Sequence, residues 1–457
     1  MPVSKARQIA FDILLRVESQ GAYASDLLHA ELNAKIKSED AALATELTMG
    51  VLRQKRLLDF LLDTYSRKRS ATLDVEVAIA LRLGLYQLRF LDRIPARAAV
   101  NESVELVKSA RKRSATTLVN AVLRRAAENS QTPVASLIPG DLPQAEHLEI
   151  LYSHPAWLIE RWLKEFGEWR AIVLLEANNR APETAGAFAF PQEREADIKT
   201  LELEGIRIAP GRWLRDAFHA AGGNISSSSV FRSGHMSVQD EASQIVPRLL
   251  NVEAGDSVLD VCAAPGGKTV TLARAAGPDA LVVATDIHEH RLRDMRAQLE
   301  RVNLKDVRLA GIDAARPLPF RQKFKRILVD APCSGTGTLA RNPEIRWRLK
   351  LDDLAEFHTR QVAMLGSALA QLEEGGRLVY STCSLEFEEN EAVVGKVLAK
   401  ARGYRRVPRA EMEAAIAPHL AAAANAASLF DVTGAFRTFP PEQHTDGFFA
   451  VAIEKRA

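Results

Sequence analysis

SVLDVCAAPGGKT, residues 257–269, joins a short apolar run to a turn of small residues that opens a helix. The apolar run predicts a buried strand, and the glycines let a ligand approach the backbone closely. Unpaired N–H groups at the start of the helix favour a nucleotide-type ligand. The stretch contains GKT, but Cys262 stands where a Walker A loop requires glycine, and the G-x-G-x-x-G pattern is missing from it as well. It therefore predicts a nucleotide-type site that is neither of these two common loops.

Strands and helices alternate regularly from about residue 237 onwards. The predicted strands are SVLDV (257–261), LVVATD (281–286), VRLAGID (307–313), KRILVDAP (325–332), GRLVYSTC (376–383) and DGFFAVAIEK (446–455). This alternation predicts an α/β fold with a mostly parallel, doubly wound, Rossmann-like sheet. Ligands of such sheets bind at the carboxyl ends of the strands. Residues at the strand ends are therefore the candidates for function.

Two aspartates end predicted strands. Asp286 follows Gly267 by 19 residues, a separation at which an acidic side chain binds the ribose hydroxyls of a nucleotide. Asp313 ends the next strand and can reach the base of the same ligand. Each position is also typical of a helix N-cap, and this structural alternative stays open.

Two of the three cysteines follow neighbouring predicted strands. Cys333 lies in DAPCSGTG (330–337) and Cys383 in YSTCS (380–384). Adjacent parallel strands lie about 4.8 Å apart, so both thiols and the Asp330 carboxyl can face one pocket. A single cysteine is more often inert in a core, but two at these positions favour chemistry. A thiolate that adds to C6 of a pyrimidine makes C5 nucleophilic enough to attack a methyl sulfonium.

The rest of the chain divides by pattern. Residues 1–128 show apolar spacings of three and four, which predict an all-helical domain, and a proline-containing linker follows over 129–147. Residues 148–236 predict a helical segment and a small α+β subdomain before the α/β part, 237–457. Within that subdomain we expect a strand in AGAFAF (185–190), a helix in EREADIKTLELEGI (193–206) and a loop between short strands in GGNISSSSVFRSGH (222–235).

The charge distribution favours an anionic partner for the first domain. The formal net charge is +2, yet residues 1–130 contain 21 basic against 15 acidic side chains. SRKRS (66–70) and KSARKRS (108–114) predict contacts with nucleic acid. The residues concerned are Arg67, Lys68, Arg69, Arg111, Lys112 and Arg113. A solvated helix face explains any single cluster equally well.

Composition excludes several other classes of protein. The cysteines lack C-x-x-C spacing, so we expect no structural metal, and they are too few for a disulfide framework, which indicates the cytoplasm. The first residues read as an amphipathic helix and not as a signal peptide. AAIAPHLAAAANAASLF (414–430) is too short to span a membrane. Without a coiled-coil seam, we expect a monomer.

These motifs together resemble the RNA cytosine-C5 methyltransferases, which use S-adenosylmethionine. The resemblance extends to RNPEIRW (341–347), TDGFF (445–449) and SVQDEASQ (237–244). It implies that Cys383 is the nucleophile, that Cys333 assists product release and that Asp330 contacts the pyrimidine near N3. The implied cofactor site comprises Cys262, Ala263, Ala264, Pro265, Gly266, Gly267 and Lys268, with Asp286 on the ribose, Asp313 toward the adenine, and Asp330. Arg341 and Arg346 are expected to hold RNA phosphate.

The first domain resembles the NusB-type helical RNA-binding fold. The matching elements are LRLGLYQLRFLDRIPARAAVNESVELVK (81–108) and TLVNAVLR (117–124). A NusB-like domain joined to this methyltransferase is the arrangement of the RsmB family, also called Sun or Fmu. The resemblance therefore implies 16S rRNA as the partner, naked or in an early small-subunit particle, modified at cytosine 967. Two alternatives stay open: an enzyme for tRNA or another rRNA site, and a non-catalytic RNA-binding assembly protein.

Overall fold

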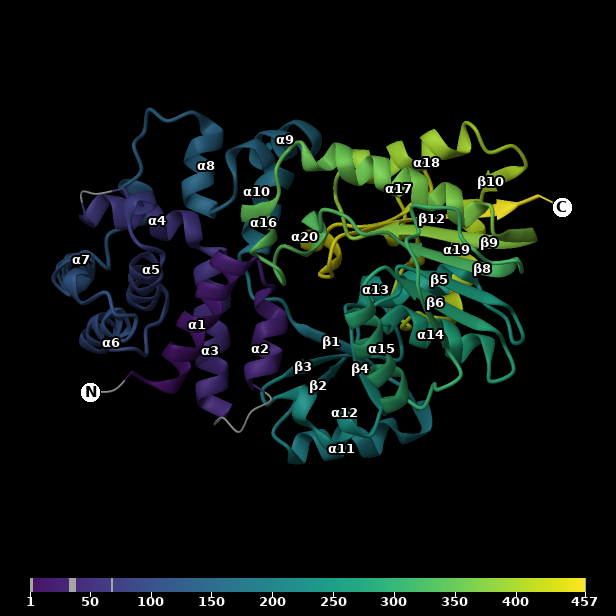
Figure 1. The fold of residues 1–457 in the computed structure, drawn as a ribbon, viewed down its shortest axis with the longest axis horizontal. Coiled ribbons are helices and arrows are strands. Elements are labelled where there is room, and N and C mark those ends of the chain that lie inside the picture. The colour runs from purple at the N-terminus through teal and green to yellow at the C-terminus, as the bar shows by residue number, and fades with distance from the viewer. Residues whose placement is uncertain (1–2, 33–37, 67–68, 457) are drawn as a thin grey trace. The chain divides into compact units, whose positions relative to one another are not determined.

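The computed structural model describes residues 3–32, 38–66 and 69–456, and the chain forms two compact units (Figure 1). The helical unit comprises Met1–Pro182 and Leu339–Leu351, and the sheet unit comprises Glu183–Thr338 and Asp352–Ala457. This division differs from the expected one in two respects. The boundary after Pro182 falls inside the region 148–236, and the expected catalytic part is interrupted by a segment that belongs to the helical unit.

Helices form the first unit, as predicted for residues 1–128, in the part that the structure describes. α1 ends at Gly21, whose left-handed backbone (φ 66°) suits glycine, and α5 is buried along most of its length at the centre of the core. The helices are α1 (Lys5–Gln20), α2 (Ala24–Leu32), α3 (Ser38–Arg53), α4 (Lys55–Ser66), α5 (Val75–Phe90), α6 (Ala96–Ser109), α7 (Thr116–Glu128), α8 (Gln144–Tyr152), α9 (Ala156–Phe166), α10 (Glu168–Asn178) and α16 (Ile345–Arg348).

Arg346 anchors the segment 339–351 inside the helical unit. Its side chain is 0% exposed, and its guanidinium donates to the carbonyl oxygens of Ser153 and Asn178, both at 3.0 Å, and to Asn179 Oδ1 at 2.8 Å. Burial lowers the pKa of Arg346 to about 9. The prediction that Arg346 holds RNA phosphate is wrong, because its guanidinium is fully buried and both terminal nitrogens donate to oxygen atoms of the helical unit.

We expect Arg346→Met to destabilise the helical unit by about 3 kcal/mol, because several buried carbonyl groups lose their donor. Denaturant unfolding followed by tryptophan fluorescence measures this change. The exposed variant Arg113→Met is the control and should change stability by less than about 0.5 kcal/mol. Equal stability of the two variants would show that Arg346 does not anchor the segment.

A small antiparallel sheet begins the second unit, with the strand order β2-β3-β1-β4. Its elements are β1 (Thr184–Phe188), α11 (Arg194–Leu203), β2 (Arg207–Pro210), β3 (Ala217–Ala221), α12 (Ser229–Arg232) and β4 (Met236–Val238), which confirm the predicted strand and helix. The predicted loop 222–235 is partly helical instead. Asn224 accepts a hydrogen bond from the N–H of Ser226, and Ser228 accepts one from Phe231, so both side chains cap short helical turns.

The main sheet has the order β10-β12-β9-β8-β5-β6-β7, and β11 pairs with β12. All six predicted strands are confirmed. The strands are β5 (Val258–Val261), β6 (Val282–Asp286), β7 (Arg308–Gly311), β8 (Phe324–Asp330), β9 (Leu372–Thr382), β10 (Tyr404–Arg406), β11 (Phe436–Thr438) and β12 (Phe448–Lys455). The helices are α13 (Glu241–Ile245), α14 (Gly267–Ala276), α15 (Glu289–Arg301), α17 (Asp353–Leu369), α18 (Glu391–Leu398), α19 (Arg409–Ile416) and α20 (Pro440–Gln443).

Strand order brings the candidate residues together. β9, β8, β5, β6 and β7 run parallel, so their carboxyl ends share one edge of the sheet. Across β8 and β9 the register pairs Asp330 with Ser381, and the two cysteine-containing loops follow directly. In the described part of the chain, no helix is long and apolar enough to cross a membrane, and no three metal-ligating side chains gather in one place.

Candidate active site

The turn after β5 forms a rigid backbone cradle at the start of α14. Cys262 (φ 63°) and Gly266 (φ 103°) both take left-handed backbone. A Cβ at Gly266 would lie 2.9 Å from Cγ of Met295, so the position requires glycine. Arg291 donates to the carbonyl oxygen of Ala264 at 2.8 Å and thereby holds the turn against α15.

Of the two aspartates predicted at strand ends, Asp286 ends β6 and is linked through Arg291 to this turn, whereas Asp313 lies two residues beyond the end of β7. Asp286 is 5% exposed, its Oδ1 accepts the N–H of His288 at 2.9 Å, and its Oδ2 lies 3.4 Å from a nitrogen of Arg291. α15 has His288 as its N-cap, so Asp286 is not the cap of that helix. Asp313 accepts the N–H of Ala315 at 3.1 Å. Short turns therefore fix both carboxyl groups near the carboxyl edge of the sheet.

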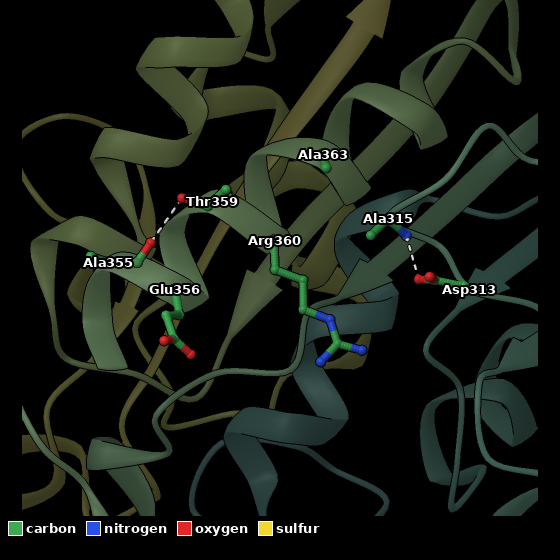
Figure 2. A pocket seen from close by; sticks show the side chains of 7 residues that line it. All are labelled: Asp313, Ala315, Ala355, Glu356, Thr359, Arg360 and Ala363. Atoms are coloured by element: carbon green, nitrogen blue, oxygen red, sulfur yellow. Dashed lines mark hydrogen bonds between the residues drawn. The ribbon is translucent and has the colours of Figure 1, made fainter. Parts of the chain in front are cut away.

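An open cavity of about 650 Å³ lies between Asp313 and α17, and Figure 2 shows Arg360 extending from the helix into it. Burial raises the pKa of the Cys262 thiol to about 12, and the carboxylate of Asp286 adds to this, whereas Arg360 opposes it. The guanidinium of Arg360 thus lies near the turn after β5. A cavity of this size admits a nucleotide-sized ligand. Arg360 was not predicted, because the sequence of its helix gives no local sign of the turn that it faces.

The two predicted cysteines meet at the ends of β8 and β9. The sulfur atoms of Cys333 and Cys383 lie 3.3 Å apart, and both thiols are free. The hydrogen bond with Cys383 and the burial of the site raise the pKa of the Cys333 thiol well above its usual value. Cys333 therefore keeps its proton and can donate it toward the sulfur of Cys383.

An ion pair lies beside the two sulfurs. Lys268 Nζ is 2.6 Å from Asp330 Oδ2, and the hydroxyl of Ser381 donates to Asp330 Oδ1 at 2.7 Å. Burial lowers the pKa of Lys268, but Asp330 outweighs this effect, and the net pKa is raised. The ammonium also interacts with Cys383 and lies 5.2 Å from the ring centre of Phe448. Lys268 thus stays charged and fixes the Asp330 carboxylate. The role of Ser381 was not predicted.

Gly337 and Gly447 let the TDGFF segment pack against the cysteine loops. The N–H of Gly337 donates to the carbonyl oxygen of Cys383 at 2.9 Å, and the N–H of Gly447 donates to Gly337 at 2.8 Å. A Cβ at Gly337 would lie 2.2 Å from the oxygen of Gly447. No side chain fits at Gly337, so this glycine fixes how the loops cross.

A buried carboxylate joins the loops that follow the two cysteines. Glu389 Oε1 accepts the N–H of Ser334 at 2.8 Å and the Nε2 of Gln361 at 2.9 Å. Its Oε2 accepts the hydroxyl of Ser384 at 2.5 Å and that of Ser334. Glu389 was not predicted, because nothing in the acidic run EFEENE (386–391) distinguishes a buried carboxylate from exposed ones.

We expect Glu389→Gln to lower the single-turnover rate of the protein by about ten- to a hundredfold, because an amide N–H₂ cannot accept from Ser334 and Ser384 and the loops shift. Rapid-quench measurement of the rate, with the affinity for S-adenosylmethionine measured in parallel, tests this. Glu374→Gln is the control, because Glu374 is exposed and lies on β9, the strand that leads to Cys383. A rate equal to that of the control would contradict the positioning role.

The predicted RNA-binding residues fall into several groups. Arg69, Arg111 and Arg113 are exposed on the helical unit, whereas Lys112 is paired with Asp74 at 2.9 Å. Arg341 is half-buried in the segment 339–351. Arg67 and Lys68 lie outside the described residues. RNA contact by the exposed members stays a prediction.

Comparison with known proteins identifies the family. Residues 247–454 match the model described as 16S rRNA methyltransferase RsmB/F, and residues 4–128 match the NusB family. Ribosomal RNA small subunit methyltransferase B of Klebsiella pneumoniae is 33% identical over 98% of both chains. Its counterpart from Pseudomonas putida is 35% identical over 90% of this chain and 93% of the relative. The chain belongs to the RsmB/F methyltransferase family.

The fold agrees with this RsmB/F assignment. The crystal structure of PH0851 matches all of both chains with a TM-score of 0.82 at 24% identity, which is a likeness of fold. The resemblances to the RsmB and NusB families are therefore confirmed. The protein is an S-adenosylmethionine-dependent RNA methyltransferase.

The RsmB/F site of this chain fits its cofactor. The close-approach turn at Gly266 and the carboxyl groups of Asp286 and Asp313 supply a backbone cradle and acceptors for hydroxyl groups. When bound, S-adenosylmethionine supplies a methyl group on a positively charged sulfur. The residues that would hold it are those of the turn 262–268 together with the two aspartates.

Proposed function

We propose that this protein methylates C5 of a cytosine in 16S rRNA, at cytosine 967, through a covalent bond between Cys383 and C6. The observation that carries the proposal is the pair of sulfurs 3.3 Å apart, beside the Lys268–Asp330 ion pair. A target base must leave its stack to reach such a pocket, as in other enzymes that modify bases.

Cys383 acts as the nucleophile in this proposal. Its thiolate forms a bond to C6, and electron density moves to C5. C5 then takes the methyl group while the bond between that group and the sulfonium sulfur breaks, and a neutral thioether is the leaving group. The C5 proton leaves to water, the bond between C6 and sulfur breaks, and the thiolate of Cys383 is restored. Electrons and atoms balance without an oxidant or a metal.

Asp330 and Cys333 support the addition and the elimination. The Asp330 carboxyl group, fixed by Lys268 and Ser381, contacts the pyrimidine near N3, where negative charge develops. The protonated Cys333 donates to the sulfur of Cys383 as that sulfur departs from C6. This assignment gives each cysteine a distinct task.

The RNA substrate is supported by the relatives. Those that match along the chain are named ribosomal RNA small subunit methyltransferases, and the first domain matches the NusB family. The exposed basic residues Arg69, Arg111 and Arg113 then hold phosphate, which makes RNA binding strongly salt-dependent.

A methyl-transfer assay tests the proposal. Wild-type protein is incubated with tritium-labelled S-adenosylmethionine and either deproteinised 16S rRNA or an early small-subunit particle, and bisulfite sequencing then maps the modified base. We expect label in 16S rRNA and protection of cytosine 967 from bisulfite.

Other outcomes distinguish the alternatives. Label in tRNA or at another rRNA position would show a related enzyme with a different substrate. Cofactor binding without transfer to any RNA would contradict the enzymatic proposal and favour an RNA-binding assembly protein.

A further inference from the structure

A second cavity, of about 350 Å³, lies in the sheet unit between the small sheet and the first turns of α14. The end of β1, the turn before β3, the short helix Val246–Leu250 and His419 complete its lining. α14 begins at the cofactor turn, and Arg274 lies about 9 Å along the helix axis from Lys268. The cavity therefore adjoins the active site along one helix but is not part of it.

Three guanidinium groups line this cavity. They belong to Arg215, Arg248 and Arg274, and within the described residues none of them forms an ion pair with a carboxylate. Asp216 is the acidic residue in the lining. Burial lowers the pKa of Arg248. Burial also lowers the pKa of His419, and both Arg248 and Arg215 add to this, whereas the carboxylate of Asp216 opposes it. Three guanidinium groups therefore face a single carboxylate, and the cavity has an excess of positive charge.

Two buried polar atoms of the lining have no partner among the described residues. Gln244 is 2% exposed, and its Nε2 donates to the carbonyl oxygen of Gln239 at 2.8 Å, which assigns the amide orientation. Its Oε1 is then an unpaired acceptor, and the Nε of Arg248 is an unpaired donor. Both atoms are closed off from solvent in this conformation, so a ligand reaches them only after a side chain of the lining rotates. Unpaired buried groups are uncommon in folded proteins. An unpaired acceptor requires a hydroxyl or N–H group, and an unpaired guanidinium donor suits an anionic oxygen.

We propose that this cavity binds a ribose phosphate of the RNA substrate, with the phosphate on the three arginines and a ribose hydroxyl on Gln244. The inference rests on the proposed function, because it takes RNA as the substrate. Arginine forks match phosphate oxygens in geometry and charge. Every ribose of RNA carries a 2′-hydroxyl group, which can donate to an amide oxygen, and the sugars of DNA lack this group. A strand held here lies beside the helix that opens at the cofactor turn.

The double variant Arg215→Gln/Arg274→Gln tests the site, because both side chains are exposed and the fold should tolerate their replacement. Filter binding of full-length protein to deproteinised 16S rRNA is measured at several salt concentrations. We expect binding to weaken about tenfold or more and the slope of log affinity against log salt to fall by about 1. The affinity for S-adenosylmethionine should not change. The KM for RNA should rise, and the rate at saturating RNA should stay within about twofold.

Arg293→Gln/Arg402→Gln is the matched control, since it removes two exposed arginines of the same unit that do not line the cavity. Equal losses in the two double variants would overturn the proposal, because the effect would then be one of net charge. Calorimetry with inorganic phosphate and with CMP forms a second arm. The double variant Arg215→Gln/Arg274→Gln could lose CMP binding and keep the RNA affinity of the wild type. That result would assign the cavity to a free nucleotide and would also overturn the proposal.

Failure of the proposed function gives a different pattern. If wild-type protein binds 16S rRNA without methylating it, and the cavity variant weakens this binding while the control variant does not, the phosphate site is supported and the assigned reaction is contradicted.

Gln244→Leu tests the hydroxyl contact. A larger loss of affinity for RNA than for DNA of the same sequence would support this contact, and equal losses would contradict it.

Discussion

Cys383→Ala should lower methyl transfer by at least about a thousandfold, because no other group is placed to add to C6. Cys333 lies 3.3 Å away but cannot replace it, since its raised pKa keeps that thiol protonated. The turn after β5 is untouched, so the affinity for S-adenosylmethionine should stay within about twofold of wild type. Single-turnover tritium transfer and calorimetry measure the two quantities.

The melting temperature of Cys383→Ala serves as the control for folding. The replacement removes one partly buried sulfur atom, and a small shift is expected. Transfer within about tenfold of wild type would exclude Cys383 as the nucleophile, because loss of a nucleophile costs far more than this.

Cys333→Ala should instead trap a covalent complex between the protein and RNA. Cys383 still adds to C6 and C5 still takes the methyl group, but the departing sulfur has lost its hydrogen-bond donor. We expect steady-state turnover to fall by about a hundredfold, as for the removal of a general acid. Denaturing electrophoresis with labelled RNA should show a slow band that ribonuclease removes.

The double variant Cys333→Ala/Cys383→Ala is the matched control for this band. It should form no complex, because the adding sulfur is missing. A trapped complex in Cys383→Ala and none in Cys333→Ala would reverse the roles of the two cysteines.

Most of the main sheet could be predicted from the sequence. Its parallel strands are apolar runs bounded by glycine, aspartate or proline, and such runs are local signals. β10 and β11 escaped prediction because strands of three residues depend on the partner strand, here β12. The helical turns at Ser226 and Phe231 were not predicted from the sequence, for another reason. Serine and asparagine runs are typical of loops, and only their side-chain caps make these turns helical.

The candidate site was predicted where a residue ends a strand. Cys333, Cys383 and Asp330 follow from the strand positions, since neighbouring parallel strands bring their carboxyl ends together. Arg360 and Glu389 lie on helical segments that reach the site only through packing. Their sequence surroundings resemble ordinary charged surface, so no local pattern marked them.

By itself the sequence determined the order of elements, the parallel sheet and the residues at its carboxyl edge, because strand and turn signals are local. The tertiary structure alone decided which charged groups are buried. Arg346 belongs to a motif that suggested RNA contact, yet its guanidinium lies among backbone oxygens of the helical unit. The unpaired arginines near Gln244 likewise come from separate segments. Burial and pairing depend on residues far apart in the chain, and no local pattern contains that information.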